Sequence, residues 1–357
     1  MDQAETRARR RSGLGTDLTI LAVVGILLIA AVGAGISTLY TSYYGPSAFV
    51  TRYLDLLSSG RAADALQVPG VTVDSAALEE AGITSTASEA MLRAAALAAL
   101  TDVTVVSEKN DGAQTSVTVS YRASGHPGTT TFLVEQDGWV GVTPNWRFST
   151  SPLAVITLTL RGADQFAVNG FEVLRGQISA AGGDAAPLDP LPMLVFTPGL
   201  YAFTVDTAIS AAPATAVLAD TPLATTPLDV QAAPTDDFVD VVQQRVEEFL
   251  TQCAQQEVLQ PTACPFGIEV TDRLASTPHW SITTQPTVTV TPDGAQWQIP
   301  PTQAVAHIEV DVQSLFDGTI EEMSTDVPFL LDGTITILPD GSASIRVGSP
   351  EGDAAQD

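Results

Sequence analysis

The pattern of apolar and polar positions divides the chain into one long apolar stretch and a series of shorter periodic segments. No charged residue occurs between Asp17 and Arg52, and residues 18–39 are apolar or small almost throughout. A helix rises about 1.5 Å per residue, so this stretch reaches about 33 Å, enough to cross a hydrocarbon core of about 30 Å. We therefore predict a transmembrane helix over residues 17–40.

The charges on either side of this stretch indicate its orientation. A basic cluster precedes it, and tyrosines follow it. Positive charge beside a first span is retained in the cytoplasm, and interfacial tyrosine suits the opposite headgroup layer. We predict a cytoplasmic tail over residues 1–16, a single-pass location in the cell membrane and an extracytoplasmic C-terminal part. The residues that determine this topology are Arg7, Arg9, Arg10 and Arg11.

Two further interpretations of the stretch stay open. A cleaved signal peptide has the same basic and apolar pattern, with Gly33–Gly35 as a cleavage region, although the run is longer than an ordinary signal. Small residues four apart, Ala30 with Ala34 and Ala31 with Gly35, allow close approach of two helices. They make a homodimer through the membrane helix a second possibility.

Residues 41–150 read as helices followed by an antiparallel sheet. Apolar residues recur at helical spacing over Ala48–Ser59, and the alanine-rich run Ser88–Leu100 has high helix propensity with Ser88 as a cap. From Asp102 onward the period changes to two, with Asp111-Gly112 as a hairpin turn. This pattern predicts an α+β domain.

Residues 151–232 have the alternation of short strands and predict a small all-β module plus a linker. Residues 233–348 open with a second amphipathic helix, whose apolar face runs from Phe238 to Cys253 and whose cap is Thr235. Strand patterns follow this helix. Asp-Gly pairs, the strongest hairpin signal, occur six times between residues 111 and 341. They are Asp111-Gly112, Asp137-Gly138, Asp293-Gly294, Asp317-Gly318, Asp332-Gly333 and Asp340-Gly341.

The predicted fold class is therefore α+β. One N-terminal transmembrane helix precedes two helix-plus-antiparallel-sheet units with a small all-β module between them, and residues 349–357 form a disordered acidic tail.

Charge and cysteine content narrow the classes of function. The chain has 15 Lys and Arg against 41 Asp and Glu, a formal net charge of −26. Such a surface repels nucleic acid, so we expect no nucleic-acid partner. Its two cysteines, Cys253 and Cys264, lie eleven apart without a nearby histidine. In an oxidising compartment this pair predicts a disulfide.

Motifs for catalysis are missing from the sequence. We find no nucleophile elbow, zinc-protease helix, glycine-rich phosphate loop or calcium loop. The scattered histidines His126, His279 and His307 predict turn or sheet positions, although a triad could still assemble in space. We expect no catalytic residue, no cofactor and no metal. The tryptophans predict sheet packing, with an aromatic ligand platform as the alternative; they are Trp139, Trp146, Trp280 and Trp297.

Three short motifs resemble those of single-pass envelope proteins of Gram-positive bacteria. They are V-x-x-Y-L-x-x-L at Val50–Leu57, F-A-V-N-G at Phe166–Gly170, and T-P-G-L-Y at Thr197–Tyr201. Such proteins include relatives of the teicoplanin-resistance-associated membrane protein family. The helix-plus-sheet units resemble the cone-shaped folds of nuclear transport factor 2 (NTF2) and cystatin. The resemblance implies an envelope location and a binding role, without naming a ligand.

The resulting functional hypothesis is a membrane-anchored, extracytoplasmic, non-enzymatic protein that binds a cell-wall component or another envelope protein, with the cytoplasmic membrane as its anchor. An alternative is an NTF2-like small-molecule pocket with isomerase- or hydrolase-like activity. A signalling receptor is third, because the cytoplasmic tail is too short for a folded output domain.

Overall fold

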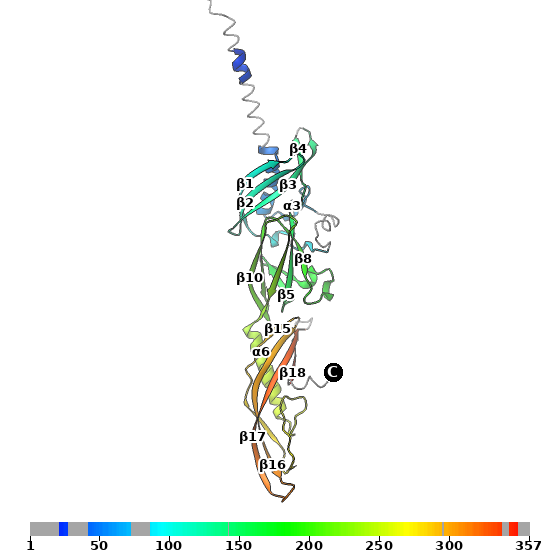
Figure 1. Ribbon diagram of the computed structural model, residues 1–357, viewed down its shortest axis with the longest axis vertical. Coiled ribbons are helices and arrows are strands. Elements are labelled where there is room, and N and C mark those ends of the chain that lie inside the picture. Colours follow the sequence, from blue (N-terminus) through cyan, green and yellow to red (C-terminus); the bar gives the residue numbers. More distant parts are fainter. Residues whose placement is uncertain are drawn as a thin grey trace, which may run out of the picture. The chain divides into compact units, whose positions relative to one another are not determined.

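The computed structural model describes residues 21–27, 42–72, 86–141, 143–294, 296–337 and 343–348 (Figure 1). Strands hold 49% of these residues and helices 20%. The described chain is mostly β and contains mixed sheets. Apolar residues alternate with polar ones over more of the chain than they recur at helical spacing. The predicted fold class, α+β with an N-terminal transmembrane helix, is therefore wrong.

The predicted membrane span is corrected as well. Of residues 17–40 the structure describes 21–27, which are helical and rise about 10 Å, a third of a bilayer core. Within the described ranges, no helix is both long enough and apolar enough to cross a membrane, so the predicted single-pass membrane location is not supported. The four topology arginines and the four small residues of the predicted dimer contact lie outside the described residues; they are Arg7, Arg9, Arg10, Arg11, Ala30, Ala34, Ala31 and Gly35.

Two compact units divide the chain. The first joins Met1–Val73 to Ala99–Pro152, and the second joins Asp74–Ala98 to Leu153–Asp357. The segment described from residue 86 to residue 98 therefore belongs with the strands that follow residue 152, although the chain enters it from the first unit.

The first unit packs one helix against a four-stranded antiparallel sheet. Helix α2 starts at a proline, which suits the first helical position. Its Tyr53 ring lies 6.1 Å from the ring of Phe132 and 5.1 Å from that of Phe148, so aromatic contacts join helix to sheet. The elements are α2 (Pro46–Ser58), α3 (Ala62–Leu66), β1 (Leu100–Asn110), β2 (Thr115–Ala123), β3 (His126–Val140) and β4 (Thr143–Phe148), with sheet order β1-β2-β3-β4.

The second unit begins with two sheets that share one hydrophobic core, the arrangement of a β-sandwich. The first sheet has the order β12-β10-β9-β6-β7, and the second has the order β11-β5-β8 with β11 parallel to β5. The strands are β5 (Leu153–Arg161), β6 (Gln165–Val168), β7 (Phe171–Leu174), β8 (Leu191–Phe196), β9 (Gly199–Asp206), β10 (Ser210–Ala219), β11 (Thr225–Gln231) and β12 (Ala233–Pro234), with the short helix α5 (Arg175–Ile178) after β7 and the 3-10 turn η3 (Gly182–Asp184) before β8.

The helix predicted over Ser88–Leu100 is wrong. The structure has only two 3-10 turns there, η1 (Glu89–Met91) and η2 (Ala94–Ala96). Ser88 pairs with β8, and its backbone N–H donates to the carbonyl of Pro192 at 2.8 Å. Met91 and Ala96 are buried in the sandwich core. Pairing and burial in the sandwich therefore override the helix propensity of the alanines.

The C-terminal domain, residues 235–348, packs one long helix against long strands (Figure 1). The predicted cap is present, because the Thr235 hydroxyl accepts a hydrogen bond from the N–H of Phe238. Strands β16 and β17 form an extended antiparallel hairpin. The elements are α6 (Asp236–Ala254), β13 (Arg273–Leu274), β14 (His279–Thr284), β15 (Thr291–Asp293), β16 (Gln296–Gln313), β17 (Ile320–Ile337) and β18 (Ala343–Gly348).

A buried tyrosine makes the sandwich sensitive to alkali. The Tyr201 hydroxyl is fully buried and donates to the carbonyl of Phe196 at 3.0 Å. Burial raises the pKa of Tyr201 above its ordinary value of about 10. Above about pH 10 the unfolded chain releases the hydroxyl proton of Tyr201, whereas the folded chain keeps it. The free energy of unfolding therefore falls by about 1.4 kcal/mol per pH unit.

We expect Tyr201→Phe to remove that part of the pH dependence, while costing about 1 kcal/mol near neutral pH for the lost hydrogen bond. Urea unfolding measured from pH 8 to pH 12 checks this. Tyr43→Phe, at a tyrosine with 68% exposure, is the matched control and should keep the wild-type slope. Equal slopes for wild type and Tyr201→Phe would contradict the account.

Candidate functional site in the C-terminal domain

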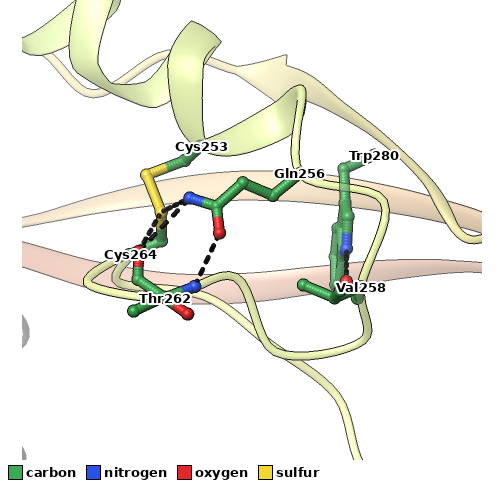
Figure 2. Close-up of a disulfide and its surroundings, with 6 residues drawn as sticks. All are labelled: Cys253, Gln256, Val258, Thr262, Cys264 and Trp280. Atoms are coloured by element: carbon green, nitrogen blue, oxygen red, sulfur yellow. Dashed lines mark hydrogen bonds between the residues drawn. A yellow bond between two sulfur atoms is a disulfide. The ribbon is translucent and has the colours of Figure 1, made fainter.

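The predicted disulfide is confirmed and fixes a loop to the end of α6 (Figure 2). Cys253 lies in the last turn of α6 and is bonded to Cys264, eleven residues on. The Gln256 amide reinforces this link: it accepts from the N–H of Thr262 at 2.8 Å and donates to the carbonyl of the same residue at 3.2 Å. The Trp280 indole donates to the carbonyl of Val258 at 2.7 Å. The loop is therefore held at several points.

The residues directly after the disulfide form one wall of a cleft. Pro265, Phe266 and Gly267 face residues 303–305 of β16 and 327–330 of β17 across a volume of about 500 Å³. The Phe266 ring lies 5.0 Å from the ring of Trp280 and 5.2 Å from that of Phe329. We call this cleft the groove. Its aromatic wall is fixed by packing. Most of the residues around it are of apolar type, but polar atoms, including those of the backbone, form slightly more than half of its exposed surface.

A hydrogen-bonded cluster lies on the same two strands, β16 and β17, close in sequence to the residues that line the groove. His307 Nδ1 is 2.6 Å from Asp326 Oδ1, and His307 Nε2 is 3.1 Å from Ser324 Oγ. The hydrogen bonds join serine, histidine and aspartate in the same sequence as in a Ser-His-Asp catalytic triad. However, the Asp326 side chain is 67% exposed, and Glu309 Oε1 lies 3.8 Å from the same Nε2. None of the three residues lines the groove. We interpret the cluster as a polar network across β16 and β17.

The turn between β16 and β17 presents large apolar side chains to solvent. Leu315 is 72% exposed, Phe316 100% and Ile320 61%. Fully exposed phenylalanine is unusual because burying such a side chain is worth about 1.5–3 kcal/mol. We call residues 313–320 the hairpin tip.

Hydrogen bonds hold the hairpin tip in one conformation. Gly318 N–H donates to the carbonyl of Ser314 at 3.0 Å, and Phe316 N–H donates to the Ser314 hydroxyl at 3.2 Å. The Thr319 hydroxyl donates to the Asp317 carboxylate at 2.8 Å. Hydrogen bonds from Thr319 and Ser314 hold the pKa of the Asp317 carboxyl below its ordinary value. The apolar side chains therefore project from a turn that is already ordered.

Charges around the hairpin tip are mostly acidic. Asp272 accepts a hydrogen bond from the N–H of Leu315 at 3.3 Å. Asp317 belongs to the turn itself, and Glu321 and Glu322 follow at the start of β17. Arg273 is the basic residue of this neighbourhood, opposite Gln313 in the pairing of β13 with β16. The exposed apolar side chains of the hairpin tip are therefore surrounded mainly by carboxylates.

The other residues singled out by the sequence are dispersed. Trp280 and Trp297 are buried in the core of the C-terminal domain, whereas Trp139 is 63% exposed on β3. The Trp146 indole donates to the carbonyl of Tyr44 at 2.8 Å. Among the described residues, no group of three or more His, Cys, Asp or Glu side chains is placed to hold a metal ion.

Sequence reasoning missed the hairpin tip, although a signal for it exists. Turns are ordinarily polar, and two large apolar residues directly before Asp317-Gly318 break that rule.

Comparisons with known proteins assign no function to these sites. No protein-family model matches the chain, and neither a curated protein nor a solved structure matches it. The resemblance to envelope proteins therefore stays a prediction.

Proposed function

We propose that this protein is a non-enzymatic binding protein whose hairpin tip inserts into an apolar pocket of a partner protein. The single observation that carries this proposal is the complete exposure of Phe316 on an ordered turn. This proposal includes the binding role predicted from the sequence but no membrane anchor.

The energetics favour the tip as a contact point. Burial of Phe316 and Leu315 in a partner would each contribute about 1.5–3 kcal/mol of transfer free energy. Aromatic side chains that fill pockets dominate the binding energy of protein interfaces. Because the turn is ordered by its own hydrogen bonds before binding, little conformational entropy is lost on association.

Charge complementarity favours one kind of partner. The acidic residues around the tip, in a chain of net charge −26, favour a pocket with a lysine- or arginine-rich rim. The same charge disfavours anionic lipid surfaces and a second copy of this chain.

Photo-crosslinking tests this proposal. With a photoreactive phenylalanine analogue at position 316 of the full chain, we expect one discrete cross-linked protein. Its yield should fall several-fold between about 0.1 M and 1 M salt, because the Debye length shrinks from about 10 Å to about 3 Å.

The same analogue at position 106 of β1, where Val106 is 62% exposed, is the matched control. Products confined to lipid, products confined to a second copy of the chain, or the same products from both positions would overturn the proposal.

A further inference from the structure

One edge of the sheet in the C-terminal domain is open. Strand β17 pairs with β16 along most of its length, whereas β18 lies beside it only from Asp332 to Ile337. Among the described residues, no strand pairs with that second side of β17 between Ile320 and Leu331. An uncovered edge presents its backbone N–H and C=O groups to any extended chain that lies beside it. We call residues 320–331 the open edge.

The pairing register shows which backbone groups of the open edge point outward. In β16, the N–H of Asp311 donates to the Ser276 hydroxyl at 2.7 Å, and its carbonyl accepts from the N–H of Ala275 at 2.8 Å. Both groups therefore point away from β17, so Asp311 and its partner Glu322 exchange no backbone hydrogen bonds. Because the two kinds of pair alternate along antiparallel strands, every second residue of the open edge points its backbone groups outward. These residues are Glu322, Ser324, Asp326, Pro328 and Leu330.

Pro328 limits the usable length of the open edge. It has no N–H, and its outward position means that the pairing with β16 loses no hydrogen bond. A strand added beside β17 would lose a hydrogen bond at Pro328. Before it, Glu322, Ser324 and Asp326 offer three N–H and three C=O groups. Within the described part of the chain, no hydrogen bond occupies these groups.

One face of the sheet beside the open edge is acidic. Three cross-strand pairs place six side chains on this face, and they are Asp311 with Glu322, Glu309 with Ser324, and His307 with Asp326. Four of the six are carboxylates. They favour lysine or arginine on the matching face of an added strand. They disfavour the same edge of a second copy, because like charges would then lie opposite each other.

The other face of the sheet belongs to the hydrophobic core. Met323 and Val327 are partly buried on this face and pack against the core of the C-terminal domain. Aliphatic side chains on the matching face of an added strand would extend this core.

We propose that the open edge binds an extended segment of a partner protein as an additional antiparallel strand. The backbone of the segment exchanges hydrogen bonds with Glu322, Ser324 and Asp326, as in other cases of peptide recognition by strand addition. Its basic side chains lie four residues apart, opposite Glu322 and Asp326. Its aliphatic side chains lie opposite Met323 and Val327. Each face of the segment therefore contacts only one face of the sheet.

Fluorescence anisotropy with a labelled peptide and the full chain tests this proposal. The probe has the sequence TIKTTIKT, which places both lysines on one face of a strand and both isoleucines on the other. We expect N-methylation of its fifth residue, whose N–H faces Ser324, to weaken binding at least about tenfold. N-methylation of its fourth residue, whose N–H points away from β17, is the matched control and should change the affinity less than about twofold.

Variants of the protein separate the backbone contacts from the side chains and from the hairpin tip. Ser324→Pro removes an outward N–H without removing a hydrogen bond to β16, so it should abolish probe binding, whereas Ser324→Ala should leave it unchanged. Glu322→Lys combined with Asp326→Lys should reverse the charge preference, toward the same peptide with glutamates in place of the lysines. Phe316→Ser should leave the affinity for the probe unchanged, because the proposed contact does not include the hairpin tip.

The two N-methylated peptides are compared on the wild-type chain, so that comparison does not depend on the folding of any variant. No binding of the probe, equal effects of the two N-methyl groups, or an unaltered charge preference in the folded double-lysine variant would overturn the proposal. Loss of probe binding in Phe316→Ser would also overturn it, because the contact would then involve the hairpin tip.

Discussion

Arg175→Ala is expected to lower the free energy of unfolding by about 3 kcal/mol, the cost of leaving buried carbonyls without a donor. Arg175 is 4% exposed in the sandwich. Its Nη2 donates to the carbonyls of Leu160 at 2.8 Å and Ala163 at 3.2 Å, and its Nε donates to Asp164 Oδ1 at 3.1 Å. One side chain thus joins the end of β5, the following loop and helix α5.

A variant series separates these hydrogen bonds from the buried charge. Nη1 of Arg175 is buried without a hydrogen-bond partner among the described residues, so the native side chain also carries a desolvation cost. Arg175→Met keeps much of the volume and removes that cost, so it should lose only about 1–2 kcal/mol. Arg161→Ala is the control, because its ion pair to Asp229 is exposed and should contribute less than about 0.5 kcal/mol.

Urea unfolding followed by far-ultraviolet circular dichroism measures all three variants. A loss below about 1 kcal/mol for Arg175→Ala, or a larger loss for Arg175→Met than for Arg175→Ala, would contradict this role.

Removal of the disulfide should be the second large effect. Replacing Cys253 by alanine and Cys264 by serine together is expected to cost about 2–3 kcal/mol, the chain-entropy value for so short a loop. Trp280 and Trp297, which are buried in the same core, report this unfolding by fluorescence.

Reduction of the wild-type protein provides an independent comparison. Wild type with a strong reductant should match the double variant, and the double variant should not respond to the reductant. An unchanged unfolding free energy in the double variant would contradict the stabilising role.

Helix α6 could be predicted from the sequence because all its local signals agree. Its apolar face, the Thr235 cap and the acidic first turn all favour the same helix, and the structure has it over Asp236–Ala254. The disulfide was predictable for a similar reason, because the chain has only two cysteines.

Tertiary contacts overrode other local signals. Asp332-Gly333 has the composition of a turn, yet it lies inside β17, where Gly333 pairs with Ile299 and Val347. A side chain at Gly333 would approach the carbonyl oxygen of Arg346 to 2.5 Å, so glycine here serves close strand packing. Asp137-Gly138 likewise lies within β3. Sequence composition alone does not distinguish these pairs from true turns.

Candidate sites were harder to predict than elements. Phe316 follows the alternating apolar residues Ile308, Val310 and Val312, so it looks like the buried end of the same strand, whereas the structure places it beyond the end of β16. The groove depends on residues about 40 to 60 positions apart in sequence, which no local pattern brings together.

Affinity for the partner identified at position 316 is the most direct test of the proposed binding role. Full-length wild type and Phe316→Ser are compared by calorimetry with that purified partner, after equal unfolding free energies show that both fold. Because burial of one phenylalanine is worth about 1.5–3 kcal/mol, we expect Phe316→Ser to bind about 10- to 150-fold more weakly. Equal affinities for the two proteins would contradict the account.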